Sequence, residues 1–315
     1  MTLVIRSLLL ASFVLSVSTS IVLAQISALP PEVAEQVRAL GPVIDPPKTA
    51  PIFAPLQQKE PYDGVAVKRD IAYGPDDRNK LDVFTPEKAE SAPRPVLIFV
   101  HGGAYVAGNK RTGTSPFYDN IMLAALANGF VGVNITYRIA PAHPYPAGTE
   151  DVGKAVQWVL ANIAANGGDP ARIFIAGHSA GAVHVANYIA HKQFHEPKGA
   201  GVKGAVLISG IFDQVAFPTA GNVVAYFGED RTKYEERSSL KGLLESKLPM
   251  LVIDAEIDPP EFIAQSKALN DALCAAGRCP TRITLAGHSH MSEVYAINSK
   301  DRQVIDAIAA FAKAN

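Results

Sequence analysis

The stretch Arg172-Ile173-Phe174-Ile175-Ala176-Gly177-His178-Ser179-Ala180-Gly181 joins a short apolar run to the pattern Gly-x-Ser-x-Gly. Residues 172–176 are typical of a buried strand, and residues 180–191 are typical of a helix. A strand, a tight turn and a helix are the setting of a nucleophile elbow, in which the glycines allow a sharp turn that raises the serine above the sheet. We therefore predict Ser179 as a nucleophile. The alternative is a plain strand–helix turn with the serine as a helix cap.

Strands and helices alternate on both sides of this stretch. Such alternation predicts one α/β domain whose mostly parallel, eight-stranded sheet has helices on both faces. Residues 210–247 are charged and irregular, and we expect them to form a small cap. The predicted strands are residues 65–73, 80–85, 95–100, 130–137, 172–176, 202–209, 249–253 and 281–285, and the predicted helices are residues 31–40, 114–127, 151–164, 180–191, 261–274 and 304–312.

The composition narrows the classes of function. The chain has 315 residues, of which 48 % are hydrophobic and 19 % charged, so it can bury a large core. The chain has 29 Lys and Arg residues and 30 Asp and Glu residues. It therefore lacks the excess of positive charge that is typical of a nucleic-acid binder or of a polybasic membrane-surface protein. The glycine-rich stretches lack the spacing of a nucleotide-binding loop. We expect no cofactor and no metal.

The N-terminal segment is typical of an export signal. Arg6 precedes an uncharged, apolar run over residues 7–24, so residues 1–24 predict a secretory signal peptide cleaved before Gln25. An uncleaved membrane anchor is the alternative. We expect a secreted or periplasmic protein with no membrane span after signal removal, in which residues 25–63 form an N-terminal arm and residues 64–315 form the main domain.

Export changes how the two cysteines are interpreted. Cys274 and Cys279 are five positions apart, where a predicted helix leads into a predicted strand. In an oxidising compartment we expect them to form a disulfide, with two free thiols as the alternative.

A second motif follows the predicted strand at residues 95–100. His101-Gly102-Gly103-Ala104-Tyr105 contains small residues whose backbone N–H groups can approach a developing oxyanion closely. We expect the N–H groups of Gly103, Ala104 and Ala180 to form an oxyanion hole, with Gly102 as a further candidate. Tyr105 either shapes the substrate pocket or packs in the core.

A serine nucleophile needs a base, and the base needs a carboxylate. His290 and His288 both follow the last predicted strand, and the residues alone separate them weakly. Asp254, Glu256 and Asp258 cluster after the strand at residues 249–253, and Asp258 lies furthest beyond its end, although it would also make a sound helix N-cap. His178, beside the nucleophile, is expected to point away from the site.

The motifs resemble those of a known family. The His101–Ala104 element, residues 137–141 and 143–147, and the elbow around Ser179 resemble the carboxylesterases of the hormone-sensitive-lipase-like α/β-hydrolase group. Residues 258–262 (Asp-Pro-Pro-Glu-Phe) are more similar to the neighbouring kynurenine-formamidase-like and feruloyl/acetyl esterase-like branch. The resemblance covers about residues 65–313 and implies the α/β-hydrolase fold.

Matched residue by residue, the resemblance implies Ser179 as nucleophile, Asp258 as acid and His290 as base, in the chain order typical of α/β-hydrolases. It implies a serine carboxylesterase that acts on a small or short-acyl carboxylic ester, without a cofactor and without a nucleic-acid partner. The alternatives are an arylformamidase-like amidase and a non-catalytic binding protein on the same fold.

Overall fold

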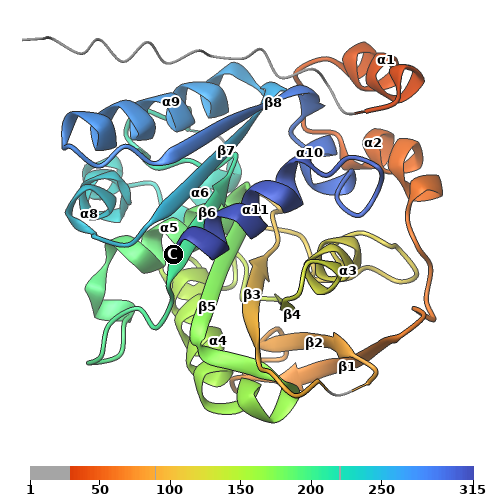
Figure 1. The fold of residues 1–315 in the computed structure, drawn as a ribbon. Coiled ribbons are helices and arrows are strands. Elements are labelled where there is room, and N and C mark those ends of the chain that lie inside the picture. The colour runs from red at the N-terminus through yellow and green to blue at the C-terminus, as the bar shows by residue number, and fades with distance from the viewer. Residues whose placement is uncertain (1–28, 89, 220) are drawn as a thin grey trace, which may run out of the picture.

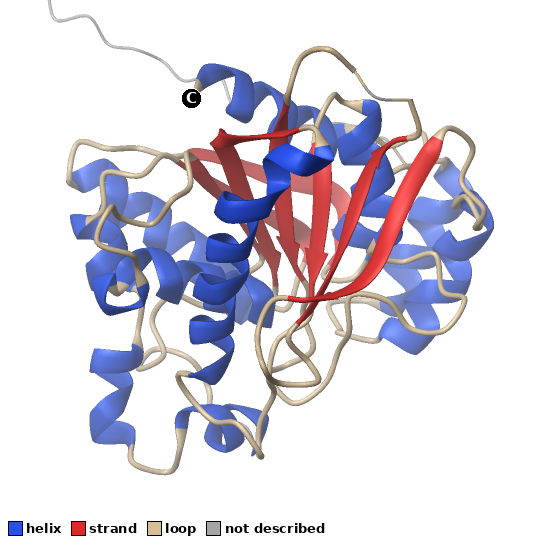
Figure 2. Ribbon diagram, turned by 90° about the horizontal axis from the view of Figure 1, so that it is seen from below, coloured by secondary structure: helices blue, strands red, loops and turns tan. Residues whose placement is uncertain are grey.

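The computed structural model describes residues 29–88, 90–219 and 221–315. Its centre is an eight-stranded sheet in the order β1-β2-β4-β3-β5-β6-β7-β8 (Figures 1 and 2). The β1–β2 and β2–β4 pairs are antiparallel, and all later neighbours are parallel. The prediction of a mostly parallel, eight-stranded α/β sheet is confirmed. The strands are β1 (Val65–Ala72), β2 (Lys80–Pro86), β3 (Arg94–Val100), β4 (Val131–Ile135), β5 (Gly168–His178), β6 (Gly204–Ile208), β7 (Met250–Ile257) and β8 (Thr281–Ser289).

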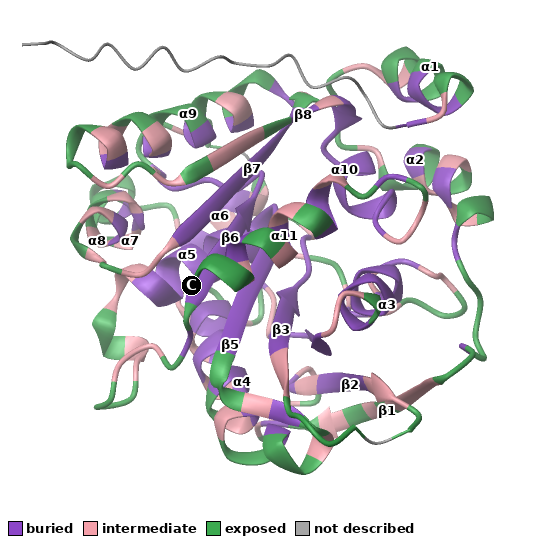
Figure 3. Cartoon of the chain, in the orientation of Figure 1, coloured by how far each residue is buried: buried purple, intermediate pink, exposed green. Residues whose placement is uncertain are grey.

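Helices cover both faces of the sheet. Residues of α1, α2, α3 and α11 pack on one face, and residues of α4, α5, α8 and α9 pack on the other. Along β3, Phe99 faces the first layer and Ile98 the second, so the central strands are buried on both sides (Figure 3). The helices are α1 (Pro31–Leu40), α2 (Pro46–Phe53), α3 (Asp119–Ala127), α4 (Ala147–Asn162), α5 (Ala180–Ala190), α6 (Gly221–Phe227), α7 (Tyr234–Arg237), α8 (Leu240–Glu245), α9 (Pro260–Ala275), α10 (Ser292–Tyr295) and α11 (Gln303–Ala314).

Some element boundaries differ from the sequence expectation. Helix α3 begins at Asp119 rather than near residue 114, because Tyr118 has a positive φ of 70°, which interrupts a helical backbone just before Asp119. Residues 210–247 are not irregular throughout, since they contain α6, α7 and α8. The proline-rich arm contains α2, where Pro46 and Pro47 occupy the first helical turn and Asp45 caps it by accepting from the N–H of Lys48.

The described part of the arm lies against the domain. Val37 and Phe53 are fully buried in the same apolar cluster as α11 and β8. The predicted signal peptide at residues 1–24 lies outside the described residues. None of the described helices has the length and apolar character that crossing a bilayer requires.

The parallel strands end at one edge, which determines where functional side chains gather. His101 follows β3, Ser179 follows β5, Ser209 follows β6, Asp258 follows β7 and His290 follows β8. In open α/β sheets, ligands bind outside the carboxyl ends of the strands.

Candidate active site

Ser179 stands on a strained turn between β5 and α5. Its backbone has φ 56° and ψ −124°, a region that L-residues rarely adopt. Gly181 permits the turn, since a Cβ there would lie 2.1 Å from the carbonyl oxygen of Val100. The N–H of Ser179 donates to the carbonyl of Ile208 on the next strand (2.9 Å), which fixes the turn to β6. Strain of this kind is held by the surrounding structure and is common at functional sites.

Asp258 and His290 meet at the same edge. His290 Nδ1 lies 2.8 Å from Asp258 Oδ1, and both side chains are fully buried. His290 Nε2 has no hydrogen-bond partner within the described part of the chain. Ser179 and His290 line one pocket, so the predicted nucleophile and the predicted base border the same cavity. The structure therefore brings together the three residues predicted as nucleophile, acid and base.

The rival histidine and aspartate have other partners. His288 Nε2 lies 2.6 Å from Asp301 Oδ2, and the hydroxyl of Ser292 lies 3.2 Å from His288 Nδ1. Asp254 accepts from the guanidinium of Arg282 (2.8 Å) and from the hydroxyl of Thr284 (2.7 Å). These contacts join β7 to β8 and anchor the loop that carries His290.

Glu256 also has a structural contact, because its carboxylate accepts from the N–H of Gly287 (2.6 Å). The alternative role of Asp258 as a helix cap is not observed. The N-cap of α9 is Pro259, and no side chain caps this helix.

The glycine loop after β3 lines the same pocket. Gly103 (φ 130°) and Ala104 (φ 50°) both have positive φ, and a Cβ on Gly103 would lie 2.1 Å from the carbonyl oxygen of Ala107. Neither the N–H of Gly103 nor that of Ala104 donates to another described residue. Ala180 is the first residue of α5, so its N–H has no acceptor within the helix. The three predicted donors therefore border the cavity that contains Ser179.

His101 supports this loop from below. Its Nδ1 lies 2.6 Å from the carbonyl oxygen of Gly102, and its ring stacks on Tyr137 with centroids 4.5 Å apart. Complete burial lowers the pKa of His101 to about 3, so the imidazole is neutral at ordinary pH. A neutral ring adds no net charge beside the glycine loop.

The pocket has a volume of about 630 Å³ and is mostly apolar. The arm contributes Ile44, and the segment before α6 contributes Phe217. Among the described residues that line the pocket there is no lysine or arginine, and Glu261 is its one acidic side chain. Tyr105 lines the pocket but is 2 % exposed and stacks on Tyr226 with centroids 4.9 Å apart. Tyr105 therefore packs in an apolar cluster and also lines the pocket.

Three polar residues beside Asp258 and His290 were not singled out by sequence as part of the site. The hydroxyl of Ser209 donates to Asp258 Oδ2 (2.5 Å), and Ser209 also has a positive φ of 44°. His178 Nε2 lies 2.8 Å from the carbonyl oxygen of His290, so the expectation that His178 points away from the site is wrong. Glu293 Oε1 lies 3.1 Å from His178 Nε2. The sequence contained one indication for Ser209, which is the polar residue at the end of the predicted strand at residues 202–209.

His178, His290 and Glu293 also form a cluster of metal-ligand types, with ligand atoms within 4.8 Å of one another and all three residues buried. The Nδ1 of His290 is already bound to Asp258, and His178 Nε2 already faces Glu293 and the His290 carbonyl. These protein contacts account for the cluster.

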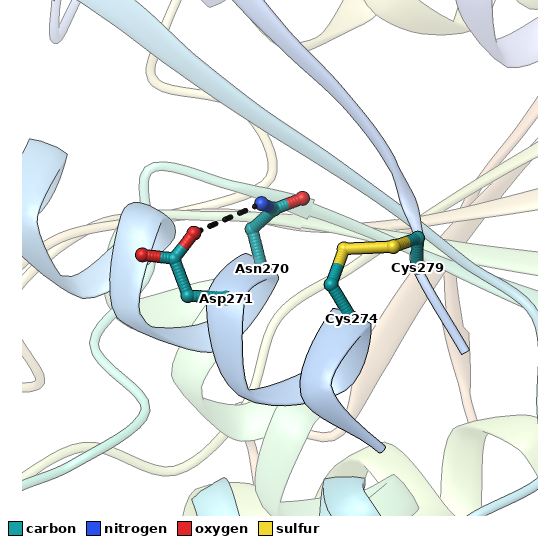
Figure 4. Close-up of a disulfide and its surroundings, with 4 residues drawn as sticks. All are labelled: Asn270, Asp271, Cys274 and Cys279. Atoms are coloured by element: carbon teal, nitrogen blue, oxygen red, sulfur yellow. Dashed lines mark hydrogen bonds between the residues drawn. A yellow bond between two sulfur atoms is a disulfide. The ribbon is translucent and has the colours of Figure 1, made fainter. Parts of the chain in front are cut away.

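The two cysteines lie away from this edge. Cys274 and Cys279 form a disulfide between the end of α9 and the start of β8 (Figure 4). The Asn270–Asp271 pair lies in the same helix, where the amide of Asn270 donates to Asp271 at 3.3 Å. The disulfide closes the α9–β8 connection, and neither cysteine lines the pocket.

Known proteins are similar to this chain in sequence. The sequence model of the BD-FAE family matches residues 81–273. The chain is 31 % identical to "Esterase LipQ" of Mycobacterium tuberculosis over 261 residues, which cover 77 % of this chain and 61 % of that protein. It is 34 % identical to "Probable carboxylesterase 13" of Arabidopsis thaliana over 172 residues, which cover 48 % of this chain and 51 % of the relative. The chain thus spans little more than half the length of these curated relatives.

Among solved structures, the hyperthermophilic esterase from the archaeon Pyrobaculum calidifontis matches with a TM-score of 0.67 and 22 % identity, covering 91 % of this chain and 98 % of that one. This likeness shows the fold. The family match extends from β2 into α9 and so includes Ser179 and Asp258. The chain therefore belongs to the BD-FAE family and has the α/β-hydrolase fold.

Proposed function

We propose that this chain is a serine carboxylesterase that hydrolyses small, uncharged or short-acyl carboxylic esters. The observation that carries the proposal is the 2.8 Å bond between Asp258 and His290 at the wall of a pocket that Ser179 also lines. A buried carboxylate on Nδ1 fixes the neutral imidazole in the tautomer whose Nε2 accepts a proton. The esterases among its relatives support the same reaction class.

In the proposed mechanism, His290 Nε2 takes the proton of the Ser179 hydroxyl as Oγ attacks the ester carbonyl. The carbonyl π bond breaks, and the resulting oxyanion accepts from the N–H groups of Gly103, Ala104 and Ala180. The tetrahedral intermediate collapses, His290 protonates the departing alkoxide, and the acyl group stays on Ser179. Water, deprotonated by His290, then attacks the acyl-enzyme. The acid leaves, and the proton returns to Ser179.

The pocket supports an uncharged substrate. Its wall is largely apolar, with Phe262 placed 4.6 Å from His290 between ring centroids. No described lining residue carries a positive charge that would pair with a phosphate or a carboxylate, and Glu261 would repel either. An apolar cavity with few polar groups is typical of small-molecule sites.

The direct test is Ser179→Ala assayed with p-nitrophenyl acetate. We expect kcat to fall by about 10³-fold or more, with the far-ultraviolet circular dichroism spectrum unchanged. Retained turnover would refute the assignment of the nucleophile. A panel of esters of graded acyl length, run beside N-formylkynurenine, would distinguish a short-acyl esterase from an arylformamidase.

We further propose that the protein is exported to an oxidising compartment. The disulfide between Cys274 and Cys279 supports this, because such bonds persist outside the reducing cytosol. Expression with residues 1–24 intact, followed by N-terminal sequencing of the exported protein, should give a chain that begins at Gln25. Recovery of full-length protein from the cytosol alone would contradict export.

A further inference from the structure

The N-terminal arm makes a buried polar contact with the segment that follows His290, and the mechanism above does not use this contact. Gln57 follows the short 3₁₀ helix at Ala54–Leu56 and is 7 % exposed. Its side-chain Nε2 donates to the carbonyl oxygen of Tyr295 (2.8 Å) and to that of Ile297 (2.9 Å), 238 and 240 positions further along the chain. An amide NH₂ group has two N–H donors, and both of them are used here.

The carbonyl groups that accept from Gln57 lie at the end of α10 (Ser292–Tyr295) and just beyond it. The last carbonyl groups of a helix have no partner within the helix and need donors from elsewhere. Asn120 at the start of α3 supplies two more, because its Nδ2 donates to the carbonyl oxygens of Val294 (2.9 Å) and Ile297 (2.8 Å). Two buried amides, one from the arm and one from α3, therefore hold the end of α10.

This clamped turn begins beside the proposed base. The N–H of Tyr295 donates to the carbonyl oxygen of Met291 (3.0 Å), the residue directly after His290. Met291 and Tyr295 also line the pocket. A shift of the carbonyl group that Gln57 holds would therefore reach the base within one helical turn.

The chain is also anchored before the base. His288 Nε2 lies 2.6 Å from Asp301 Oδ2, so His290 lies between two fixed points. Helices α2 and α10 are neighbours in the fold (Figure 1), and Phe53 of α2 is fully buried in the same apolar cluster as Val294 of α10. Loss of the amide would leave buried carbonyl groups short of a donor, which favours a shift of α10 toward another one.

We propose that Gln57 is a positioning residue, through which the N-terminal arm holds the end of α10 and keeps His290 aligned with Asp258. The proposal rests on the esterase function proposed above. It gives the arm a part in the active-site scaffold. It also predicts that the two N–H donors of Gln57 matter for turnover, whereas a glutamine elsewhere on the arm does not.

Gln57→Met tests the proposal, because methionine has a similar length and no N–H donor. We expect kcat for p-nitrophenyl acetate to fall by about tenfold while KM changes by less than about twofold, since a displaced base slows the chemical step more than it weakens binding. Gln36→Met is the matched control on the same arm. Gln36 is exposed on α1, its amide donates to the carbonyl oxygen of Glu32 in the same helix (3.1 Å), and the variant should equal wild type.

The proton resonance of His290 Nδ1–H provides a readout without turnover, because it reports the hydrogen bond to Asp258. The downfield resonance should weaken or move upfield in Gln57→Met and stay unchanged in Gln36→Met. A purely structural role would lower the Tm of Gln57→Met and leave both the resonance and kcat of the folded protein as in wild type. If Gln57→Met does not fold, Gln57→Asn withdraws the amide by one methylene, and we expect a smaller change in the same direction.

Two results would overturn the proposal. The first is a folded variant at position 57 with wild-type kcat and an unchanged His290 resonance. The second is a higher KM with wild-type kcat, which would show that the arm shapes the pocket wall and does not position the base. Failure of the esterase proposal would instead appear as a wild-type protein that hydrolyses no ester, or as an active Ser179→Ala, and neither result depends on Gln57.

Discussion

His290 Nδ1 and Asp258 Oδ1 lie 2.8 Å apart, although the two residues follow different strands and are 32 positions apart in the chain. Asp258 Oδ2 is also engaged, since it accepts from Ser209 (2.5 Å) and from the N–H of Ala255 (3.1 Å). The carboxylate is therefore held on both oxygens. This leaves it one productive orientation toward His290, and His290 can present only Nε2 to the pocket.

Asp258 and Asp254 provide a matched pair of substitutions. Asp258→Asn should lower kcat for p-nitrophenyl acetate by about three to four orders of magnitude, because an amide can stabilise the wrong tautomer of His290 and cannot stabilise the imidazolium. Asp254→Asn should keep kcat within about threefold, since Asp254 pairs with Arg282 and Thr284 instead. Steady-state kinetics on both variants decide the matter. Equal losses in the two variants would contradict the assignment of the acid.

Glu261 should influence the choice between neutral and anionic esters. It is the acidic side chain of the pocket wall and is exposed at its edge. Glu261→Gln should raise kcat/KM for a p-nitrophenyl hemisuccinate ester by about two- to fivefold, the size of a solvent-screened charge interaction. The value for p-nitrophenyl butyrate should stay the same, and added salt should reduce the difference. An equal change for both esters would show that the charge has no part in selectivity.

The disulfide should contribute to stability and not to catalysis. Cys274 and Cys279 enclose a short loop, so replacing both with serine should lower the free energy of unfolding by about 2 kcal/mol, the entropy expected for so small a ring. The value of kcat should not change, because the bond lies away from the pocket. Urea unfolding with and without a reducing agent measures the effect. A double-serine variant that still responds to the reductant would point to another cause.

Glu293 should also make stability depend on pH. Its folded-state pKa is raised by burial, whereas the unfolded chain releases the proton near pH 4.3, so the cost of keeping Glu293 protonated grows as the pH rises. The difference between the free energy of unfolding of Glu293→Gln and that of wild type should therefore grow in favour of the variant. The expected change is about 1.4 kcal/mol per pH unit, from about pH 4.3 up to the folded-state pKa of Glu293. Urea unfolding between pH 5 and pH 8 provides the measurement. Parallel stability curves for the two proteins would show that Glu293 is ionised in the fold.

Strands with continuous apolar runs and turns marked by glycine were predictable from the sequence. The apolar runs of β3 and β5 and the glycines around Ser179 each point to one local structure. Helix α2 was missed because proline is read as a breaker, although it suits the first helical turn, where the missing N–H has no partner to lose.

The candidate site was predictable where a motif marks it and not where contacts between distant strands create it. Ser179 carries its own signature of flanking glycines. Ser209 does not, because its contact with Asp258 depends on which strand end lies beside β7, and strand order is a property of the folded sheet. His178 was misplaced for the same reason, since its partner is the backbone of His290, 112 positions away.

The central claim is that Ser179 becomes covalently acylated during turnover. Wild-type protein mixed with p-nitrophenyl acetate and quenched in acid early in the reaction should release a burst of p-nitrophenol. Peptide mass spectrometry should then find one acetyl group on the peptide that contains Ser179. The same experiment on Ser179→Ala should show neither burst nor acetylation. A wild-type enzyme that turns over ester while this peptide stays unmodified, or that carries the acetyl group on another residue, would contradict the account.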